Sequence, residues 1–144
     1  MPSKREDVTA AVLALLAAAL PSARVERESD GQDMVPTGGH VVLRDLGSQE
    51  PERTIGAITY WHQHNFAIEV YAAATANADR FAALDAMTLS IDGALSSDRT
   101  IGGVVHACDW IVDEMEDVTD DGADTVRAAQ INLTCEYQTA TPLG

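Results

Sequence analysis

Apolar and polar residues alternate along two stretches near the end of the chain, and this pattern predicts a long β-hairpin between Val104 and Tyr137. Asp121 and Gly122 suit the two central positions of a type I′ turn, because both tolerate a positive φ. With that turn, the apolar rows of both arms fall on one face. The opposed pairs are then Cys108 with Cys135, Trp110 with Leu133, and Val112 with Ile131. A bulge would shift this pairing by one residue.

Two further stretches follow helical spacing. Ser3 and Glu6 have the spacing of a capping box, and Pro21 ends the first helix. Its apolar stripe comprises Val8, Val12, Leu15, Leu16 and Leu20. The second helix begins at Asn77, which is a good N-cap. Its stripe comprises Phe81, Leu84, Thr88, Ile91 and Leu95.

Strand-like segments lie between these helices. Residues 23–28 alternate weakly and suit a short edge strand, and residues 40–46 form a strand. Residues 54–74 are too long for one typical strand, so this segment bends or divides. Its second half has an apolar row made of Phe66, Ile68, Val70 and Ala72. We therefore predict one α+β domain over residues 1–144, in which an antiparallel sheet carries both helices on one face.

The charge of the chain limits its partners. Its 144 residues have a formal net charge of −14, with 23 acidic and 9 basic residues. Such a surface repels nucleic-acid phosphates and anionic membranes, so groove reading, non-specific DNA binding and membrane docking are not expected. Much of the acid crowds around the predicted hairpin turn. We interpret it as a solvated loop, whose repulsion water, a cation or a basic partner would screen.

The start of the chain imitates a secretory signal, because Lys4 and Arg5 precede an apolar stretch that ends near Ala23. However, Glu6 and Asp7 stand where a signal has only positive charge, and the apolar residues follow helical spacing. We therefore expect no secretion. No apolar run reaches the roughly eighteen residues of a membrane span. The two cysteines are expected to be reduced, half-buried thiols, although the register permits a bridge.

Two residue groups resemble parts of metal sites. His62 and His64 share a strand face, but no third ligand lies nearby, so surface histidines are the favoured interpretation. Asp117, Thr119, Asp121 and Gly122 match the first half of a calcium loop. Ala128 occupies the position of the final bidentate Glu in such a loop. We predict no metal and no cofactor, and expect at most loose cation screening.

No catalytic pattern is evident. Cys108 and His106 share a face but have no oriented acid behind them, and the chain lacks the G-x-S-x-G and H-E-x-x-H motifs. We therefore predict that the chain is not an enzyme. The only aromatic cluster comprises Tyr60, Trp61 and Phe66, interleaved with His62 and His64. A core role and an interface role fit this cluster equally well.

Several segments together resemble the tail terminator, or tail completion, proteins of long-tailed phages, prophages and phage-like gene transfer agents. The resembling segments are Gly38-Gly39-His40-Val41-Val42-Leu43-Arg44-Asp45, Thr59-Tyr60-Trp61-His62-Gln63-His64 leading into Ile68-Glu69-Val70, the helix from Arg80 to Leu95, Asp98-Arg99-Thr100-Ile101-Gly102-Gly103, Asp109-Trp110-Ile111, and the ending Tyr137-Gln138-Thr139-Ala140-Thr141-Pro142-Leu143-Gly144. The likeness spans nearly the whole chain and depends on the order and spacing of these segments. It involves no catalytic motif.

The resemblance implies a structural virion protein, assembled in the bacterial host cytoplasm and located at the junction of tail and neck. It implies a ring, expected to be a hexamer, that caps the tail tube, ends tail growth and meets the head–tail connector protein. DNA would pass through the ring without specific binding. Within this interpretation we assign Tyr60, Trp61, His62, His64 and Phe66 to the oligomer interface, and Asp117, Asp120, Asp121 and Asp124 to the channel. The alternatives are a small acyl-transferase-like enzyme and a secreted cation-binding module.

Overall fold

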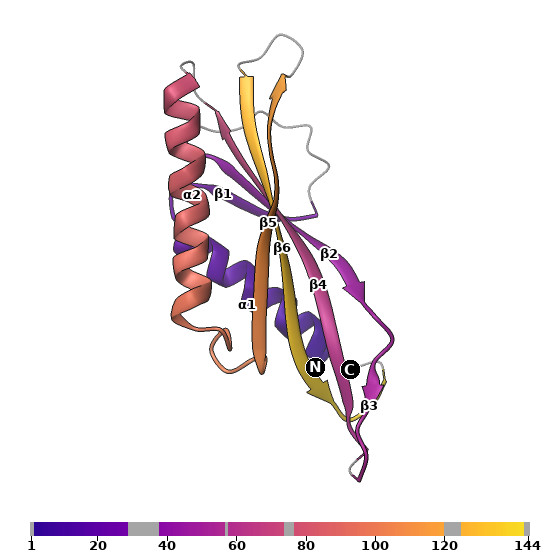
Figure 1. The fold of residues 1–144 in the computed structure, drawn as a ribbon. Coiled ribbons are helices and arrows are strands. Elements are labelled where there is room, and N and C mark those ends of the chain that lie inside the picture. Colours follow the sequence, from indigo (N-terminus) through magenta and orange to yellow (C-terminus); the bar gives the residue numbers. More distant parts are fainter. Residues whose placement is uncertain (1, 29–37, 57, 74–76, 120–124, 143–144) are drawn as a thin grey trace.

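Two helices cover one face of a six-stranded sheet in the computed structural model, which describes residues 2–28, 38–56, 58–73, 77–119 and 125–142 (Figure 1). The helices and strands, in chain order, are α1 Lys4–Ala19, β1 Arg24–Arg27, β2 His40–Ser48, β3 Glu52–Arg53, β4 Tyr60–Ala73, α2 Asn77–Ser97, β5 Ala107–Thr119 and β6 Thr125–Thr139. The predicted α+β class, with both helices on one side of the sheet and a long C-terminal hairpin, is confirmed.

The strand order is β1-β2-β4-β6-β5, and the short β3 pairs with β4. All pairs are antiparallel except β1 with β2, which are parallel, so the sheet is mixed. The predicted edge strand at residues 23–28 corresponds to β1. The long segment at residues 54–74 contributes one uninterrupted strand, β4, which begins at Tyr60.

The hairpin formed by β5 and β6 has the predicted register over its first half. Cys108 lies opposite Cys135, and the pairing continues in step as far as Val112 and Ile131. A bulge follows, because Glu114 pairs with the next residue, Gln130. Toward the turn the predicted pairing is therefore wrong by one residue, since the bulge adds a residue to β5. The predicted Asp121-Gly122 turn lies outside the described residues.

The core lies between the sheet and the helices. The predicted row on β4 is buried, and α1 contributes Val8, Val12 and Leu16, each fully buried. From α2, Leu84, Ile91 and Leu95 enter the same core. Phe81 differs from the prediction, because the residue is 46% exposed and the Arg127 guanidinium lies 4.3 Å from its ring centroid. This cation–π contact holds the ring at the rim of the core.

The N-terminus of α1 has half of the predicted capping box. The Ser3 hydroxyl accepts a hydrogen bond from the Glu6 amide at 3.2 Å. The Glu6 carboxylate instead accepts from both terminal nitrogens of Arg27, at 2.5 and 3.2 Å, and so ties α1 to β1. This bidentate pair lowers the pKa of Glu6, chiefly through its hydrogen bond with Arg27.

The second face of the sheet carries no helix among the described elements, and polar side chains pair across its strands (Figure 1). Arg44 Nε donates to Glu69 at 2.7 Å, and the Thr134 hydroxyl donates to Asn65 at 2.9 Å. Gln63 donates to Glu136 at 3.2 Å. Cross-strand pairs of this kind are typical of a solvated sheet face. Neither described helix combines the length and apolar content that crossing a membrane requires.

Candidate functional site

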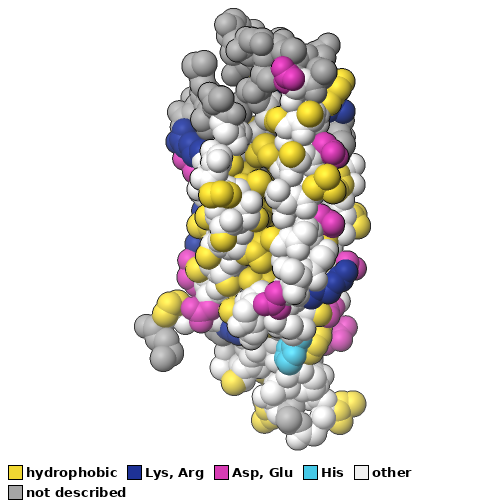
Figure 2. Space-filling model, turned by 90° about the vertical axis from the view of Figure 1, so that its left-hand side faces the viewer, with side chains coloured by type: hydrophobic (Ala, Val, Ile, Leu, Met, Phe, Trp, Pro, Cys, Tyr) yellow, Lys and Arg dark blue, Asp and Glu magenta, His cyan; other side chains and the backbone are white. Residues whose placement is uncertain are grey.

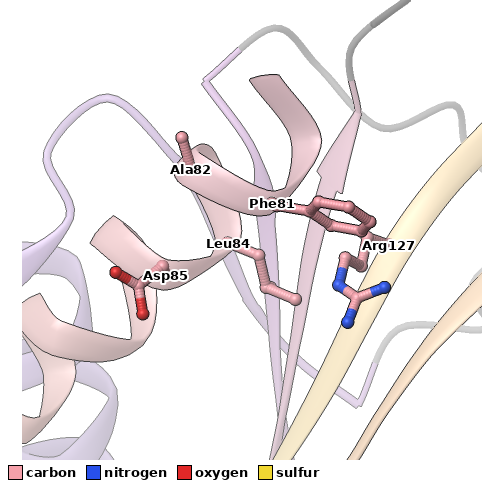
Figure 3. Close-up of a pocket in the computed structure, with 5 residues that line it drawn as sticks. All are labelled: Phe81, Ala82, Leu84, Asp85 and Arg127. Atoms are coloured by element: carbon pink, nitrogen blue, oxygen red, sulfur yellow. The ribbon is translucent and has the colours of Figure 1, made fainter. Parts of the chain in front are cut away.

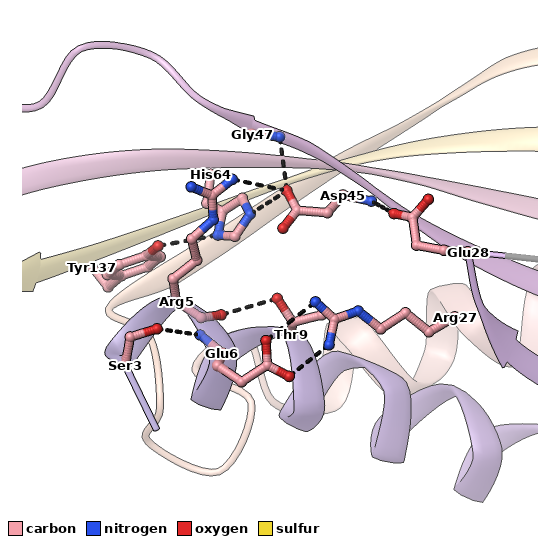
Figure 4. Close-up of polar contacts among 10 residues, drawn as sticks. All are labelled: Ser3, Arg5, Glu6, Thr9, Arg27, Glu28, Asp45, Gly47, His64 and Tyr137. Carbon is pink, nitrogen blue, oxygen red and sulfur yellow. Dashed lines mark hydrogen bonds and ion pairs between the residues drawn. The ribbon is translucent and has the colours of Figure 1, made fainter. Parts of the chain in front are cut away.

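A buried histidine lies at the centre of the best-connected polar cluster in the described part of the molecule (Figure 4). His64 is fully buried on β4, and its Nε2 lies 2.7 Å from Asp45 Oδ1 on β2. Its Nδ1 lies 3.0 Å from the Tyr137 hydroxyl on β6. Because ionised Asp45 can only accept, Nε2 carries the proton, and Nδ1 accepts from Tyr137. The neutral imidazole therefore uses both of its ring nitrogens.

The polypeptide positions Asp45 from two sides. The ladder between β2 and β4 shifts between Asp45 and Gly47, and the Gly47 amide turns back to donate to Asp45 Oδ1 at 2.7 Å. Gly47 has a φ of +82°, which glycine adopts without strain. From α1, the Arg5 guanidinium lies 3.5 Å from the same oxygen. The cluster thus joins the start of α1 to three strands.

Burial and hydrogen bonding together set the protonation states of His64 and Asp45. Desolvation lowers the pKa of His64, although the hydrogen bond and the charge of Asp45 act in the opposite direction. Burial also opposes ionisation of Asp45, but the hydrogen bonds from His64 and Gly47 outweigh it and lower the Asp45 pKa. The cluster therefore combines a neutral imidazole with an ionised carboxylate at neutral pH.

The expectation that His62 and His64 are surface residues is wrong. They share a face of β4, as predicted, but that face is turned toward the helices, and both are buried. His62 Nε2 lies 2.6 Å from the Thr139 hydroxyl, and its ring stacks on Tyr137 at 5.2 Å. Both partners come from β6, and the Thr139 hydroxyl, 77 residues away in sequence, satisfies the ring Nε2 that burial would otherwise penalise.

These groups are poorly suited to nucleophilic chemistry. Burial raises the pKa of Tyr137 and of Cys135 to about 12. The opposed Cys108 is also a buried free thiol, and burial raises its pKa. A thiol in this state is a weak nucleophile, because the thiolate is the reactive form. Among the described residues no His, Cys, Asp or Glu cluster has the arrangement of a metal site.

A shallow hollow lies between α2 and β6 (Figure 3). Phe81 and Leu84 form its apolar wall, and Arg127 lies beside the Phe81 ring. Ala82 and Asp85 complete the lining. The lining contains one carboxylate but no cysteine, serine or histidine, so it has no pair of nucleophile and base.

The residues assigned to an oligomer interface divide into two groups. His62, His64 and Phe66 lie in the core, with exposed fractions of 3%, 0% and 0%. In this conformation their side chains present no surface to a partner. Tyr60 and Trp61 are half-buried at the start of β4, and Trp61 stacks on His106 at 5.2 Å. An interface role stays a prediction for these two residues.

Most of the residues assigned to the channel lie outside the part of the chain that the structure describes. Asp120, Asp121 and Asp124 lie outside the described residues. Asp117 belongs to β5, where its backbone pairs with Arg127. The calcium-like half-loop lies partly in the same undescribed segment.

Sequence reasoning missed the exposed aliphatic side chains at two edges of the sheet. Ile55 is fully exposed and Ile58 is 66% exposed, both between β3 and β4. Ile111 and Val112, on β5, are 64% and 49% exposed. For Ile55 and Ile58 the available signal was their position in a short polar and glycine-containing connection, before the strand alternation begins.

A further band of hydrophobic side chains lies on the side of the molecule where α2 is found (Figure 2).

Comparison with known proteins identifies no family. No protein-family model matches the chain, and no curated protein matches it significantly. One similar solved structure is a chain described as "Virion of native gene transfer agent (GTA) particle", with a TM-score of 0.49 and 16% sequence identity. The match covers 92% of this chain and 95% of that chain. A likeness at this score does not establish a family or a function.

Proposed function

We propose that this chain is a structural protein of a phage-like particle, assembled in the host cytoplasm, that forms a six-membered ring on the end of the tail tube. There it stops tube growth and presents a surface to the head–tail connector. Two lines of reasoning support the proposal: the sequence resembles tail terminator proteins over most of its length, and the resembling segments have scaffold roles in this fold.

The first resembling segment shapes the entry to β2. Gly39 has a φ of +92°, and an added Cβ would lie 2.6 Å from Met87 Cε and 3.2 Å from the Tyr71 carbonyl oxygen. Only glycine fits this combination of conformation and close approach. The segment therefore fixes how β2 passes beneath α2.

The segment Asp98–Gly103 shapes the turn between α2 and β5. Asp98 accepts hydrogen bonds from the Thr100 amide at 3.0 Å and from the Gly102 amide at 2.8 Å. Ile101 has a φ of +49°, which costs strain for a β-branched residue. The Asp98 bonds hold the turn in place and lower the pKa of that carboxyl, chiefly through a further hydrogen bond from the Thr100 hydroxyl at 2.6 Å.

The segment Asp109-Trp110-Ile111 attaches the edge strand β5 to the helix layer. Trp110 Nε1 donates to Asp92 Oδ1 on α2 at 2.8 Å, and the Arg99 guanidinium lies 4.7 Å from the Trp110 ring centroid. The next side chain, Ile111, is exposed. This segment therefore holds an edge strand in place while leaving aliphatic surface on it.

The observation that carries the proposal is that, within the described residues, these segments serve the scaffold and its edges. Where three of them meet, at Asp45, His64 and Tyr137, the side chains bind one another around a buried histidine and line no described cleft. A protein that works by shape and self-association needs this arrangement. Within the ring, we assign Asp117, Asp120, Asp121 and Asp124 to the channel wall, where like charge would keep passing DNA from adhering. A ring structure with these carboxylates on its outer rim would refute that assignment.

Deletion of the gene in the strain that makes the particle tests the function. We expect tails of uneven and excessive length without attached heads, and recovery of normal particles on complementation. Tails of normal length that are joined to heads would contradict the proposal. The isolated protein should be a monomer or weak oligomer by light scattering, because a ring formed before the tube is complete would be a dead end.

A further inference from the structure

We propose that, in this ring, an arm between β3 and β4 of one copy binds the β5 edge of the next copy. The arm comprises residues 52–61, and the β5 edge comprises residues 109–113. The inference rests on the ring of the proposed function and adds the two surfaces that join its subunits. Both surfaces consist of described backbone segments with exposed aliphatic side chains, apart from residue 57 in the arm.

Backbone hydrogen bonds hold the described part of the arm. Glu52 and Arg53 pair with Trp61 and Tyr60, and the Thr54 amide donates to the Thr59 carbonyl at 3.0 Å. The hairpin extends beyond the helix layer at the lower end of the molecule (Figure 1). Its isoleucines, Ile55 and Ile58, leave most of their surface in water. Covering these two exposed aliphatic side chains with a partner surface would be stabilising.

The β5 edge is separated from the arm by β6, because β6 lies between β4 and β5 in the sheet. β5 pairs with β6 on one side, and the strand order places no described strand on its other side. Ile111 and Val112 project to opposite faces of the strand and are both exposed. The bulge after Val112 leaves Asp113 without an opposed residue on β6. Such a bulge discourages indiscriminate strand pairing at an edge that still carries apolar side chains.

Charge favours a second copy of this chain as the occupant. The arm contains one acidic residue, Glu52, and one basic residue, Arg53, so its formal charge is zero. The β5 edge carries Asp109 and Asp113 and no basic residue, and the Asp109 side chain is 87% exposed. Copies with a net charge of −14 repel one another, so a stable contact should place a surface without net negative charge against the acidic edge.

The positions of the two surfaces determine the kind of assembly. Because the arm and the β5 edge are different surfaces of the same subunit, their contact is heterologous. Repeated heterologous contacts with a closing rotation generate a ring, whereas an isologous contact generates only a dimer. The four aliphatic side chains would form the apolar centre of the interface, and Arg53 with the two aspartates its polar rim.

Cysteine cross-linking tests this pairing directly. Ile58→Cys and Ile111→Cys are made separately in the full chain and mixed at high protein concentration with a short bis-maleimide. The native Cys108 and Cys135 are buried thiols of raised pKa, so wild type is the blank. We expect a cross-linked dimer from the mixture and from neither variant alone. The double variant I58C/I111C should give a ladder that ends at the ring size.

A second measurement compares how strongly single-residue variants self-associate. Ile55→Ser should weaken self-association about tenfold or more, as loss of one buried aliphatic side chain predicts. Leu89→Ser is the matched control, because Leu89 is 61% exposed on α2, away from both surfaces, and its variant should associate like wild type. Arg53→Glu should weaken association and reduce its sensitivity to salt.

The outcomes separate this inference from the proposed function. If gene deletion gives overlong tails but the mixed variants form no cross-link, even in assembled particles, the ring uses other surfaces and this inference is wrong. Cross-links within either single variant would indicate an isologous contact and would also overturn it. If the mixed variants cross-link but deletion leaves the tails normal, the contact is real and the tail-capping role is wrong.

Discussion

The two faces of the sheet are stabilised by different interactions within this chain. On the helix-covered face, aliphatic and aromatic side chains of β4 and β6 are buried against α1 and α2. On the other face, polar side chains pair across strands, as Arg44 does with Glu69. The first face is completed by packing and the second by hydrogen bonds and water. Neither needs a partner, so unsatisfied apolar surface concentrates at the edges and on the outside of the helices.

This difference predicts that stability and assembly depend on separate residues. Substitutions on the covered face should change unfolding free energy, those on the open face should change little, and those at the edges should change association. The predictions that follow test this separation, from the largest expected effect to the smallest.

Two isoleucines of the same hairpin give the largest contrast. Ile131 is 1% exposed on β6, whereas Ile111 is 64% exposed on β5. Ile131→Ala should lower the free energy of unfolding by about 2–5 kcal/mol, because it removes buried surface and leaves a cavity. Ile111→Ala should lower it by less than about 1 kcal/mol. Urea denaturation measures both, and similar losses would contradict the assigned burial.

The buried cluster should be the next most sensitive place. Asp45→Ala removes the acceptor for His64 Nε2 and the anion beside Arg5. We expect a loss of about 1–3 kcal/mol, since a buried donor is left without a partner. His64→Gln, which can retain a bond to Asp45, should cost less. If Asp45→Ala were neutral in urea denaturation, the cluster would have no structural role.

The pKa shift of His64 predicts loss of stability in mild acid. Its pKa in the folded protein lies below the ordinary value of 6.5, so the unfolded chain binds the proton more readily. Stability should therefore be fully present above pH 6.5 and should fall as the pH drops through the folded pKa. His62 contributes in the same direction, because burial also lowers its pKa.

Thermal unfolding from pH 7.5 to 5 measures this loss. His64→Gln removes one titrating group and should flatten the profile, while the contribution of His62 remains. A profile that is unchanged in His64→Gln, or one that rises toward acid pH, would contradict the assigned neutral state.

The open face should give the smallest effect. The Arg44 and Glu69 side chains are 34% and 19% exposed, and their ion pair lies on the solvated side of the sheet. A double-mutant cycle with Arg44→Ala and Glu69→Ala should give a coupling of about 1 kcal/mol or less, reduced by salt. A coupling several times larger would show that this face is drier than its polar side chains indicate.

Local patterns predicted much of the framework. The alternation in β4 and β6 predicted the apolar rows that are buried, and the opposed cysteines followed from the hairpin register. On β5 the predicted row is less complete, because Val112 is 49% exposed. The spacing of apolar residues identified both helices. These features depend on neighbours within a few residues, or on a single hairpin, so the sequence alone contains their signal.

The remaining features depend on tertiary partners. His64 is buried because Asp45 and Tyr137 meet it from other strands, and no local pattern shows that meeting. Glu6 leaves its expected capping role because Arg27 lies within reach in the fold. The bulge beside Asp113 and the parallel pairing of β1 likewise follow from how the whole sheet is assembled.

Cryo-electron microscopy of the intact particle tests the central proposal most directly. We predict a ring of six copies of this chain between the tail tube and the connector, with the arm of each copy against β5 of the next. Particles that lack this chain at the junction of tail and head, or that hold it there as an isolated subunit, would contradict the account.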